Sequence, residues 1–144
     1  MRRGSLPLTK PREPRADVLM GVARRVLAWE RAPAGSRVEI TLLSAAAMRR
    51  LNRRATGRRG LTDVIAYALP QPDGRLVGDV YICPAAAARV ARNGVGMNEE
   101  LMRLAVHGTL HVLGYDHPES ARRTRSAMWR LQERYVQRLV RSRR

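Results

Sequence analysis

The spacing of apolar and polar residues along the first half of the chain predicts a helix, a strand and a second helix. Residues 17–31 place apolar side chains at helical spacing, with Asp17 as a candidate N-cap. Residues 37–43 alternate apolar and polar side chains, which is typical of a half-buried strand. Ser44 can then cap a short helix over residues 45–54.

The second half of the chain predicts a hairpin followed by three helices. Residues 63–69 and 76–83 are expected to be paired strands, because the proline and glycine residues between them are typical of a turn. Helices are expected over residues 84–92, over residues 98–113 with the first residue as the cap, and from Pro118 onward.

These elements together predict an α+β fold, with a small mixed β-sheet packed with about five helices. Residues 101–113 are apolar nearly all round, so their helix should be central and buried. We expect this central helix to carry metal-binding histidines, because His107 and His111 lie within it.

Length and charge predict one domain that binds a polyanion. We expect a flexible basic arm over residues 1–15 and a single domain over residues 16–144. The chain has 28 basic and 12 acidic residues, a net charge of +16, and Lys10 is its single lysine. Codon usage in a high-GC genome would explain arginine over lysine, but not the surplus over acidic residues. We therefore favour nucleic acid over an anionic membrane or a merely basic surface.

Cysteine usage and hydropathy indicate the compartment. Cys83 is the only cysteine, which excludes an intrachain disulfide and a zinc site built from several thiolates. No segment approaches the ~20 apolar residues of a membrane span, and residues 1–15 lack the apolar core of a signal peptide. We expect a cytoplasmic protein in a reducing environment, with no membrane partner.

All three histidines lie within one short stretch, at positions 107, 111 and 117. Four helical residues turn the chain by about 400°, so the rings of His107 and His111 share one face, about 6 Å apart along the axis. A continued helix would carry His117 to the far side, but Gly114 can adopt the left-handed conformation that ends a helix and turns the chain back. We predict that the three imidazoles bind one metal ion.

The predicted ligand set favours catalytic zinc. Three imidazoles suit zinc, with nickel or copper as alternatives. Three protein ligands leave a fourth position open, which is typical of catalytic rather than structural zinc. Water bound there could ionise near about pH 7 and act as a nucleophile.

The residues around the histidines bear on the substrate. Metalloproteases with this spacing carry Glu directly after the first histidine as general base, and here that position is Gly108. Three neutral ligands and many arginines favour an anionic substrate such as a phosphodiester. Asp116 is the candidate catalytic residue, as a general acid or base or as a residue that orients a ligand histidine. Capping of the last helix is the alternative role for Asp116.

The histidine stretch resembles the signature of the YbeY endoribonuclease family of rRNA maturation factors. Two further segments agree with the family. Leu51-Asn52 followed by Thr62–Tyr67 resembles its L-N and P-T-D-V-L-S-F motifs, and Gly78–Ile82 resembles its G-D-I-x-I strand. The resemblance extends from about residue 38 to residue 135.

This resemblance implies a single-strand-specific, zinc-dependent endoribonuclease that acts in 16S rRNA 3′-end maturation and ribosome quality control. The implied cofactor is one Zn²⁺ ion, and the implied partners are ribosomal RNA and the small ribosomal subunit. His107, His111 and His117 match the zinc ligands of the family one for one.

The chain departs from the family pattern near the first of these motifs. The family usually has Tyr-Arg, with the arginine linked to activity, where this chain has Ala55 and Thr56. Arg58 and Arg59 lie nearby, and we expect them to bind substrate and supply the lost positive charge. A solvated loop is the alternative interpretation of this pair.

Two other functions stay open at this level. One is a non-catalytic, zinc-stabilised module that binds RNA or the ribosome through its arginines, which the departures at Ala55 and Thr56 would fit. The other is a metallopeptidase, which the glycine at position 108 disfavours.

Overall fold

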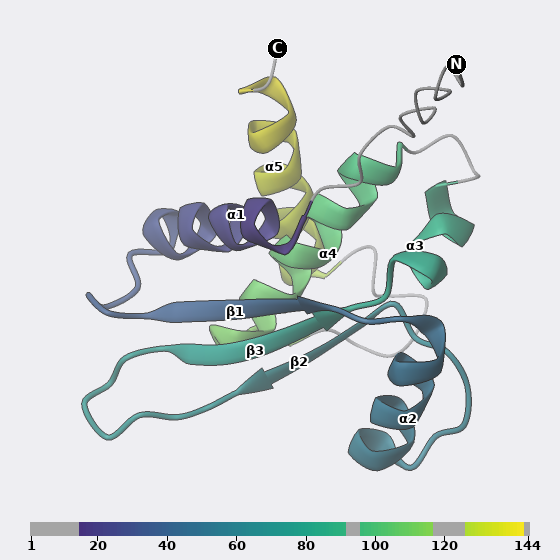
Figure 1. The fold of residues 1–144 in the computed structure, drawn as a ribbon. Coiled ribbons are helices and arrows are strands. Elements are labelled where there is room, and N and C mark those ends of the chain that lie inside the picture. The colour runs from purple at the N-terminus through teal and green to yellow at the C-terminus, as the bar shows by residue number, and fades with distance from the viewer. Residues whose placement is uncertain (1–14, 92–95, 117–125, 143–144) are drawn as a thin grey trace, which may run out of the picture.

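The computed structural model describes residues 15–91, 96–116 and 126–142 (Figure 1). Over these ranges it contains five helices and one three-stranded mixed sheet, which confirms the predicted α+β class. The elements in chain order are α1 Ala16–Trp29, β1 Arg37–Leu42, α2 Ala45–Thr56, β2 Val64–Ala68, β3 Val77–Ile82, α3 Pro84–Ala91, α4 Met97–Val112 and α5 Ala127–Arg141.

The sheet has the strand order β1-β3-β2. Strands β2 and β3 are antiparallel, with Ala66 opposite Val80, which confirms the predicted hairpin. Strand β1 pairs with β3 in parallel, with Ile40 opposite the same Val80. The central strand is therefore the last of the three in the sequence, and Val80 lies at the middle of the sheet.

Helix α4 is the central, buried helix that the apolar run predicts. Helices α1 and α4 cover one face of the sheet, and α5 packs against α4 (Figure 1). Leu101, Ala105 and Leu110 of α4 are fully buried in the main core. Because the helix is held on several sides, the side chains on its remaining face have defined positions.

A second, smaller cluster of buried residues anchors α2. Met48 of α2 packs with Cys83, just after β3, and with Ala86 of α3. Cys83 is fully buried and acts as a small core side chain. This packing fixes α2 against the segment that links β3 to α3.

Two predicted caps are wrong. Helix α1 begins after Arg15 rather than at Asp17, and α4 begins after Gly96 rather than at Asn98; neither start has a side-chain cap. In α4, the helix starts earlier because Met97 packs against the main core, while Asn98 is exposed. Packing therefore outweighs the local preference for a capping side chain.

Three further predictions concern residues outside the described ranges. They are the flexible arm over residues 1–15, apart from Arg15 itself, the start of the last helix at Pro118, and the position of His117. Helix α5 is described from Ala127, with the Ser126 hydroxyl oxygen accepting a hydrogen bond from the Trp129 backbone N–H. Within the described residues, no helix is both long and apolar enough to cross a membrane.

Candidate metal centre and its groove

Two histidines on one face of α4 point their ring nitrogens at each other. The Nε2 atoms of His107 and His111 are 3.0 Å apart, and the ring centroids are 4.6 Å apart in an edge-to-face arrangement. This is the face-sharing that the four-residue spacing predicts. Both Nε2 atoms therefore face the same small region of space.

The other ring nitrogen of each histidine faces an oxygen atom. His107 Nδ1 lies 2.7 Å from the side-chain oxygen of Gln132, and His111 Nδ1 lies 2.9 Å from the backbone oxygen of Tyr115. Oxygen atoms of amides accept hydrogen bonds, so both Nδ1 atoms act as donors. Each neutral ring therefore carries its proton on Nδ1 and presents a lone pair at Nε2.

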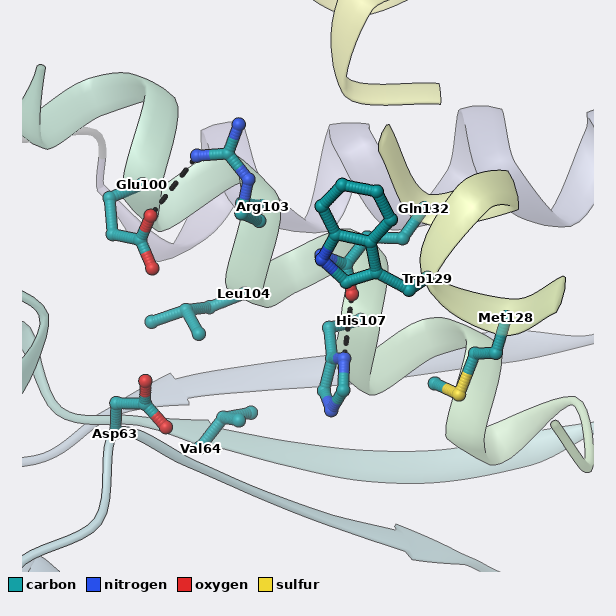
Figure 2. Close-up of a pocket in the computed structure, with 9 residues that line it drawn as sticks. All are labelled: Asp63, Val64, Glu100, Arg103, Leu104, His107, Met128, Trp129 and Gln132. Atoms are coloured by element: carbon teal, nitrogen blue, oxygen red, sulfur yellow. Dashed lines mark hydrogen bonds and ion pairs between the residues drawn. The ribbon is translucent and has the colours of Figure 1, made fainter. Parts of the chain in front are cut away.

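The orientation of the Gln132 amide follows from the residues behind it. Its Nε2 donates to the Glu133 carboxylate at 3.0 Å, so its oxygen must be the atom that faces His107. The Glu133 carboxylate also accepts two hydrogen bonds from Arg103, from Nε at 2.8 Å and from Nη2 at 2.9 Å. A continuous chain of hydrogen bonds thus runs from Arg103 to the imidazole of His107, and Figure 2 shows its last link.

Arg103 is shared among three carboxylates of α4 and α5. Besides Glu133, it contacts Glu99 at 3.2 Å and Glu100 at 3.1 Å. Burial raises the pKa of Glu100, and the hydrogen bond from Arg103 only partly offsets this effect. For Glu133, burial also acts upward, but hydrogen bonds from Arg103 and Gln132 outweigh it and lower the pKa. Glu133 is therefore held as the acceptor that the chain of hydrogen bonds requires.

The turn after α4 places the carbonyl that orients His111. Gly114 has a φ of +101°, its N–H donates to the His111 carbonyl, and the Tyr115 N–H donates to the Leu110 carbonyl. This pattern is a Schellman motif, and it confirms the prediction that Gly114 ends the helix in the left-handed conformation. The Tyr115 hydroxyl donates to Glu30 at the end of α1, which ties the turn to the rest of the domain.

The donor set of this face fits a zinc ion. Two nitrogen ligands at ~2.0–2.1 Å from a tetrahedral ion lie about 3.3 Å from each other, close to the 3.0 Å between the two Nε2 atoms. Both rings have the tautomer that metal binding through Nε2 requires, and both are oriented by hydrogen bonds at Nδ1. The third predicted ligand, His117, lies outside the described residues, directly after Asp116.

The glycine after His107 has a packing role. A Cβ atom at position 108 would lie 2.5 Å from Cγ1 of Val80 in the central strand. This position therefore points toward the sheet, away from the histidine face, and the close approach of α4 to β3 depends on a glycine here. A glutamate base of the peptidase kind is sterically incompatible with this backbone.

A large groove lies beside the two histidines, between α2, β2 and α4, with a volume of about 1080 Å³. It brings together the predicted residues Arg58, Arg59, His107, His111 and Asp116. Its remaining lining residues are Asn52, Thr56, Leu61, Thr62, Asp63, Val64, Ile65, Ala66 and Ala68. Of these five candidate residues, two are arginines, two are histidines and one is a carboxylate.

The loop that carries the two arginines is shaped by a buried asparagine. The Asn52 side chain donates to the Gly60 carbonyl at 3.2 Å and accepts from the Thr56 hydroxyl at 3.0 Å. The Thr56 hydroxyl in turn accepts from the Arg58 backbone N–H at 3.1 Å. Asn52 and Thr56 therefore position the loop along the groove.

Gln132 and Asp63 are site residues that sequence reasoning missed. Apolar residues stand at helical spacing in the last helix at Met128, Leu131, Tyr135 and Leu139, but Leu131 is only partly buried. Gln132 is 5% exposed and takes the inward position instead. A polar residue four positions after Met128 and three before Tyr135 was the available signal. For Asp63 the available signal was its place in the Thr62–Tyr67 segment that resembles the family motif.

Comparison with known proteins identifies the family. The family described as "Endoribonuclease YbeY" matches residues 11–140 of this chain. The chain belongs to the YbeY family. The resemblance first seen in the histidine stretch therefore extends over nearly the whole domain.

Individual relatives agree with the family assignment. The Micrococcus luteus protein named "Endoribonuclease YbeY" is 36% identical over 129 residues, covering 83% of this chain and 81% of the relative. The protein of the same name from Mycobacterium tuberculosis (strain CDC 1551 / Oshkosh) is 34% identical over 134 residues, covering 85% and 75%. The solution structure of TM1509 from Thermotoga maritima matches with a TM-score of 0.58 and 27% identity, covering 87% of this chain and 83% of that one.

Proposed function

We propose that this YbeY-family protein is a zinc-dependent endoribonuclease that cleaves single-stranded RNA in the groove beside α4. The observation that carries the proposal is the pair of facing Nε2 atoms, 3.0 Å apart, on the wall of a groove that Arg58 and Arg59 also line. The names of the relatives support RNA cleavage as the activity. His107, His111 and His117 are the proposed ligands of one Zn²⁺ ion.

The arginines of the groove have the role of binding RNA phosphates. Arg58 and Arg59 are exposed, lie in the loop shaped by Asn52, and carry fixed positive charge. Guanidinium groups bind phosphate oxygens through paired hydrogen bonds, and they stabilise negative charge that develops during cleavage. In this proposal they replace the family arginine that is absent at Thr56.

The histidine face and Asp116 have the role of the reaction centre. When bound, zinc supplies Lewis-acid polarisation of a phosphoryl oxygen and activates water for attack. Asp116 lines the same groove and directly precedes His117, so we assign it the role of accepting or returning the proton. Gln132 and the Tyr115 carbonyl keep the two described ligands in the required tautomer.

The family and the charge support a proposal for the cellular role. We propose that the substrate is ribosomal RNA, in 16S rRNA 3′-end maturation and ribosome quality control, and that the protein acts in the cytoplasm with the small ribosomal subunit. A net charge of +16 supports a polyanionic partner of this kind.

The deciding experiment compares the wild-type protein with His111→Ala. Metal analysis of the purified proteins is combined with cleavage of precursor 16S rRNA, both free and within small subunits. We expect stoichiometric zinc and cleavage in the wild type, with zinc and cleavage lost in the variant while its circular dichroism and RNA affinity are retained. Equal cleavage by the two proteins would reject the proposed reaction centre.

A second candidate function is a non-catalytic RNA-binding module stabilised by zinc. The observation that favours it is the presence of Ala55 and Thr56 where the family usually has Tyr-Arg. Under this alternative, wild-type protein binds small subunits but leaves the precursor intact, and His111→Ala lowers the melting temperature without any change in processing.

A further inference from the structure

A second cavity shares His107 with the groove, and Arg58 and Arg59 do not line it. It is a half-open hollow between α4, α5 and the start of β2, and its volume is about 180 Å³ (Figure 2). Asp63, Val64 and His107 line both this cavity and the groove that contains Arg58 and Arg59. The cavity and the groove therefore adjoin at His107, and we call the cavity the α4–α5 pocket.

One wall of the α4–α5 pocket is an aromatic ring without a ring partner. Trp129 is partly exposed, and among the described residues it makes no aromatic or cation–π contact. The other tryptophan of the chain, Trp29, is fully engaged, because it packs on Tyr135 at 5.0 Å and lies beneath the guanidinium of Arg138 at 4.4 Å. The Trp129 ring is thus available for stacking by a planar ligand.

The opposite wall of the pocket carries carboxylates. Figure 2 shows Asp63 and Glu100 across the pocket from Trp129 and His107. The one arginine among the lining residues, Arg103, is bound by three carboxylates, those of Glu99, Glu100 and Glu133. Carboxylates therefore outnumber arginines among the lining residues, and the pocket favours a ligand that donates hydrogen bonds over a phosphate.

We propose that the α4–α5 pocket binds one RNA base next to the scissile phosphate, and that it selects a base with an exocyclic amino group. The base stacks on Trp129, as unpaired bases commonly stack on aromatic side chains. Its amino group donates to the carboxylate wall, the pairing known between Asp or Glu and cytosine N4. Uracil has no amino group and is the disfavoured base. The inference rests on the proposed function and specifies its substrate.

The proposed division of the site separates the two chemical parts of a nucleotide. The phosphate is held on the arginine side of His107, where Arg58 and Arg59 lie, and the base enters the acidic side. A base can enter a pocket between two helices and stack on Trp129 only after leaving its own stack and its pairing partner. Cleavage of unpaired RNA in preference to duplex follows from this arrangement.

The test is equilibrium binding of zinc-loaded protein to short labelled 2′-O-methyl oligonucleotides, one all cytidine and one all uridine. We expect the cytidine strand to bind the wild type several-fold more tightly. Trp129→Leu should lower its affinity about tenfold, the loss typical of one stacked base. Trp129→Phe should restore most of the affinity, and Gln137→Leu, an exposed neutral site on the same helix, should leave it unchanged.

The outcomes separate this inference from the proposed function. If Trp129→Leu binds both strands as well as the wild type does, or if cytidine and uridine bind equally, the pocket is not a base site even when cleavage of rRNA is normal. If the wild type cleaves no RNA but prefers cytidine in a Trp129-dependent way, the base site stands and the catalytic proposal fails.

Discussion

Gln132 of α5 accepts a hydrogen bond from His107 of α4, with 2.7 Å between Oε1 and Nδ1. The two residues are separated by 25 positions in the sequence. The Gln132 amide is oriented by its hydrogen bond to Glu133, which in turn accepts from Arg103. It fixes which ring nitrogen of His107 is unprotonated. The helix that packs against α4 therefore controls the ligand that α4 presents.

Removal of this hydrogen bond should weaken zinc binding. We expect Gln132→Leu to lower zinc affinity about 10- to 100-fold, because a ligand histidine without its orienting partner loses its tautomer and ring position. The measurement is a competition titration with a zinc chelator, supported by ¹⁵N NMR of the His107 ring in the metal-free protein. Gln137→Leu on the same helix is the matched control. An unchanged affinity and an unchanged Nδ1 proton would show that Gln132 is only a packing residue.

The close approach of α4 to β3 should make Gly108 intolerant of any side chain. We expect Gly108→Ala to reduce the free energy of unfolding by about 1–3 kcal/mol, because its Cβ would overlap Val80. Gly21→Ala in α1 is the control, since its Cβ would lie 3.6 Å from the nearest atom, a side-chain nitrogen of Arg24. That change should stabilise by about 0.5–1 kcal/mol through helix propensity. Urea denaturation of both variants gives the comparison, and equal stabilities would contradict the packing argument.

The loop arginines should contribute to RNA affinity by neutralising phosphates. We expect the double variant Arg58→Ala/Arg59→Ala to retain zinc and to bind RNA more weakly. The slope of log affinity against log salt should become shallower by about 1.4, or about 0.7 for each phosphate that an arginine no longer neutralises. Cleavage should fall with affinity.

The control for the arginine pair removes the same charge elsewhere. Arg24 on α1 and Arg134 on α5 are exposed and do not line the groove. Their double replacement by alanine should change the salt slope much less. If both double variants behave alike, net charge rather than the groove determines binding.

Two of the three glutamates that bind Arg103, Glu100 and Glu133, should make stability depend on pH in opposite directions. The pKa of Glu133 is lowered from 4.5, so its stabilising contribution is present above that value and is lost as the pH falls through the folded-state pKa. The pKa of Glu100 is raised from 4.5, so its contribution is present below that value and is lost as the pH rises through the folded-state pKa.

Substitution of each glutamate separates these effects. The free energy of unfolding, measured by urea from about pH 3 to about pH 7, should fall less steeply with acid in Glu133→Gln than in the wild type. In Glu100→Gln it should fall more steeply, because the opposing contribution is gone. Parallel curves for all three proteins would mean that folding shifts the pKa of neither carboxylate.

Much of the fold follows from local patterns in the sequence. The apolar runs in residues 63–69 and 76–83 and the turn residues between them are sufficient for the β2–β3 hairpin, because those strands are close in sequence. The parallel pairing of β1 with β3 joins residues 40 positions apart, and no local pattern encodes the partner of such a strand. The start of α4 was also decided by packing, that of Met97, rather than by a capping residue.

The sequence likewise predicted one part of the candidate site, and the tertiary structure decided the rest. The sequence by itself determined that His107 and His111 face one point, because helical geometry aligns residues four apart, and that Gly114 ends their helix, because glycine adopts positive φ without strain. Only the tertiary structure decided the protonation of His107 and the existence of the α4–α5 pocket. The first depends on Gln132, and the second depends on Trp129 as well. Both residues lie beside α4 only because α5 packs on it, an arrangement set by burial of apolar surface rather than by any local preference.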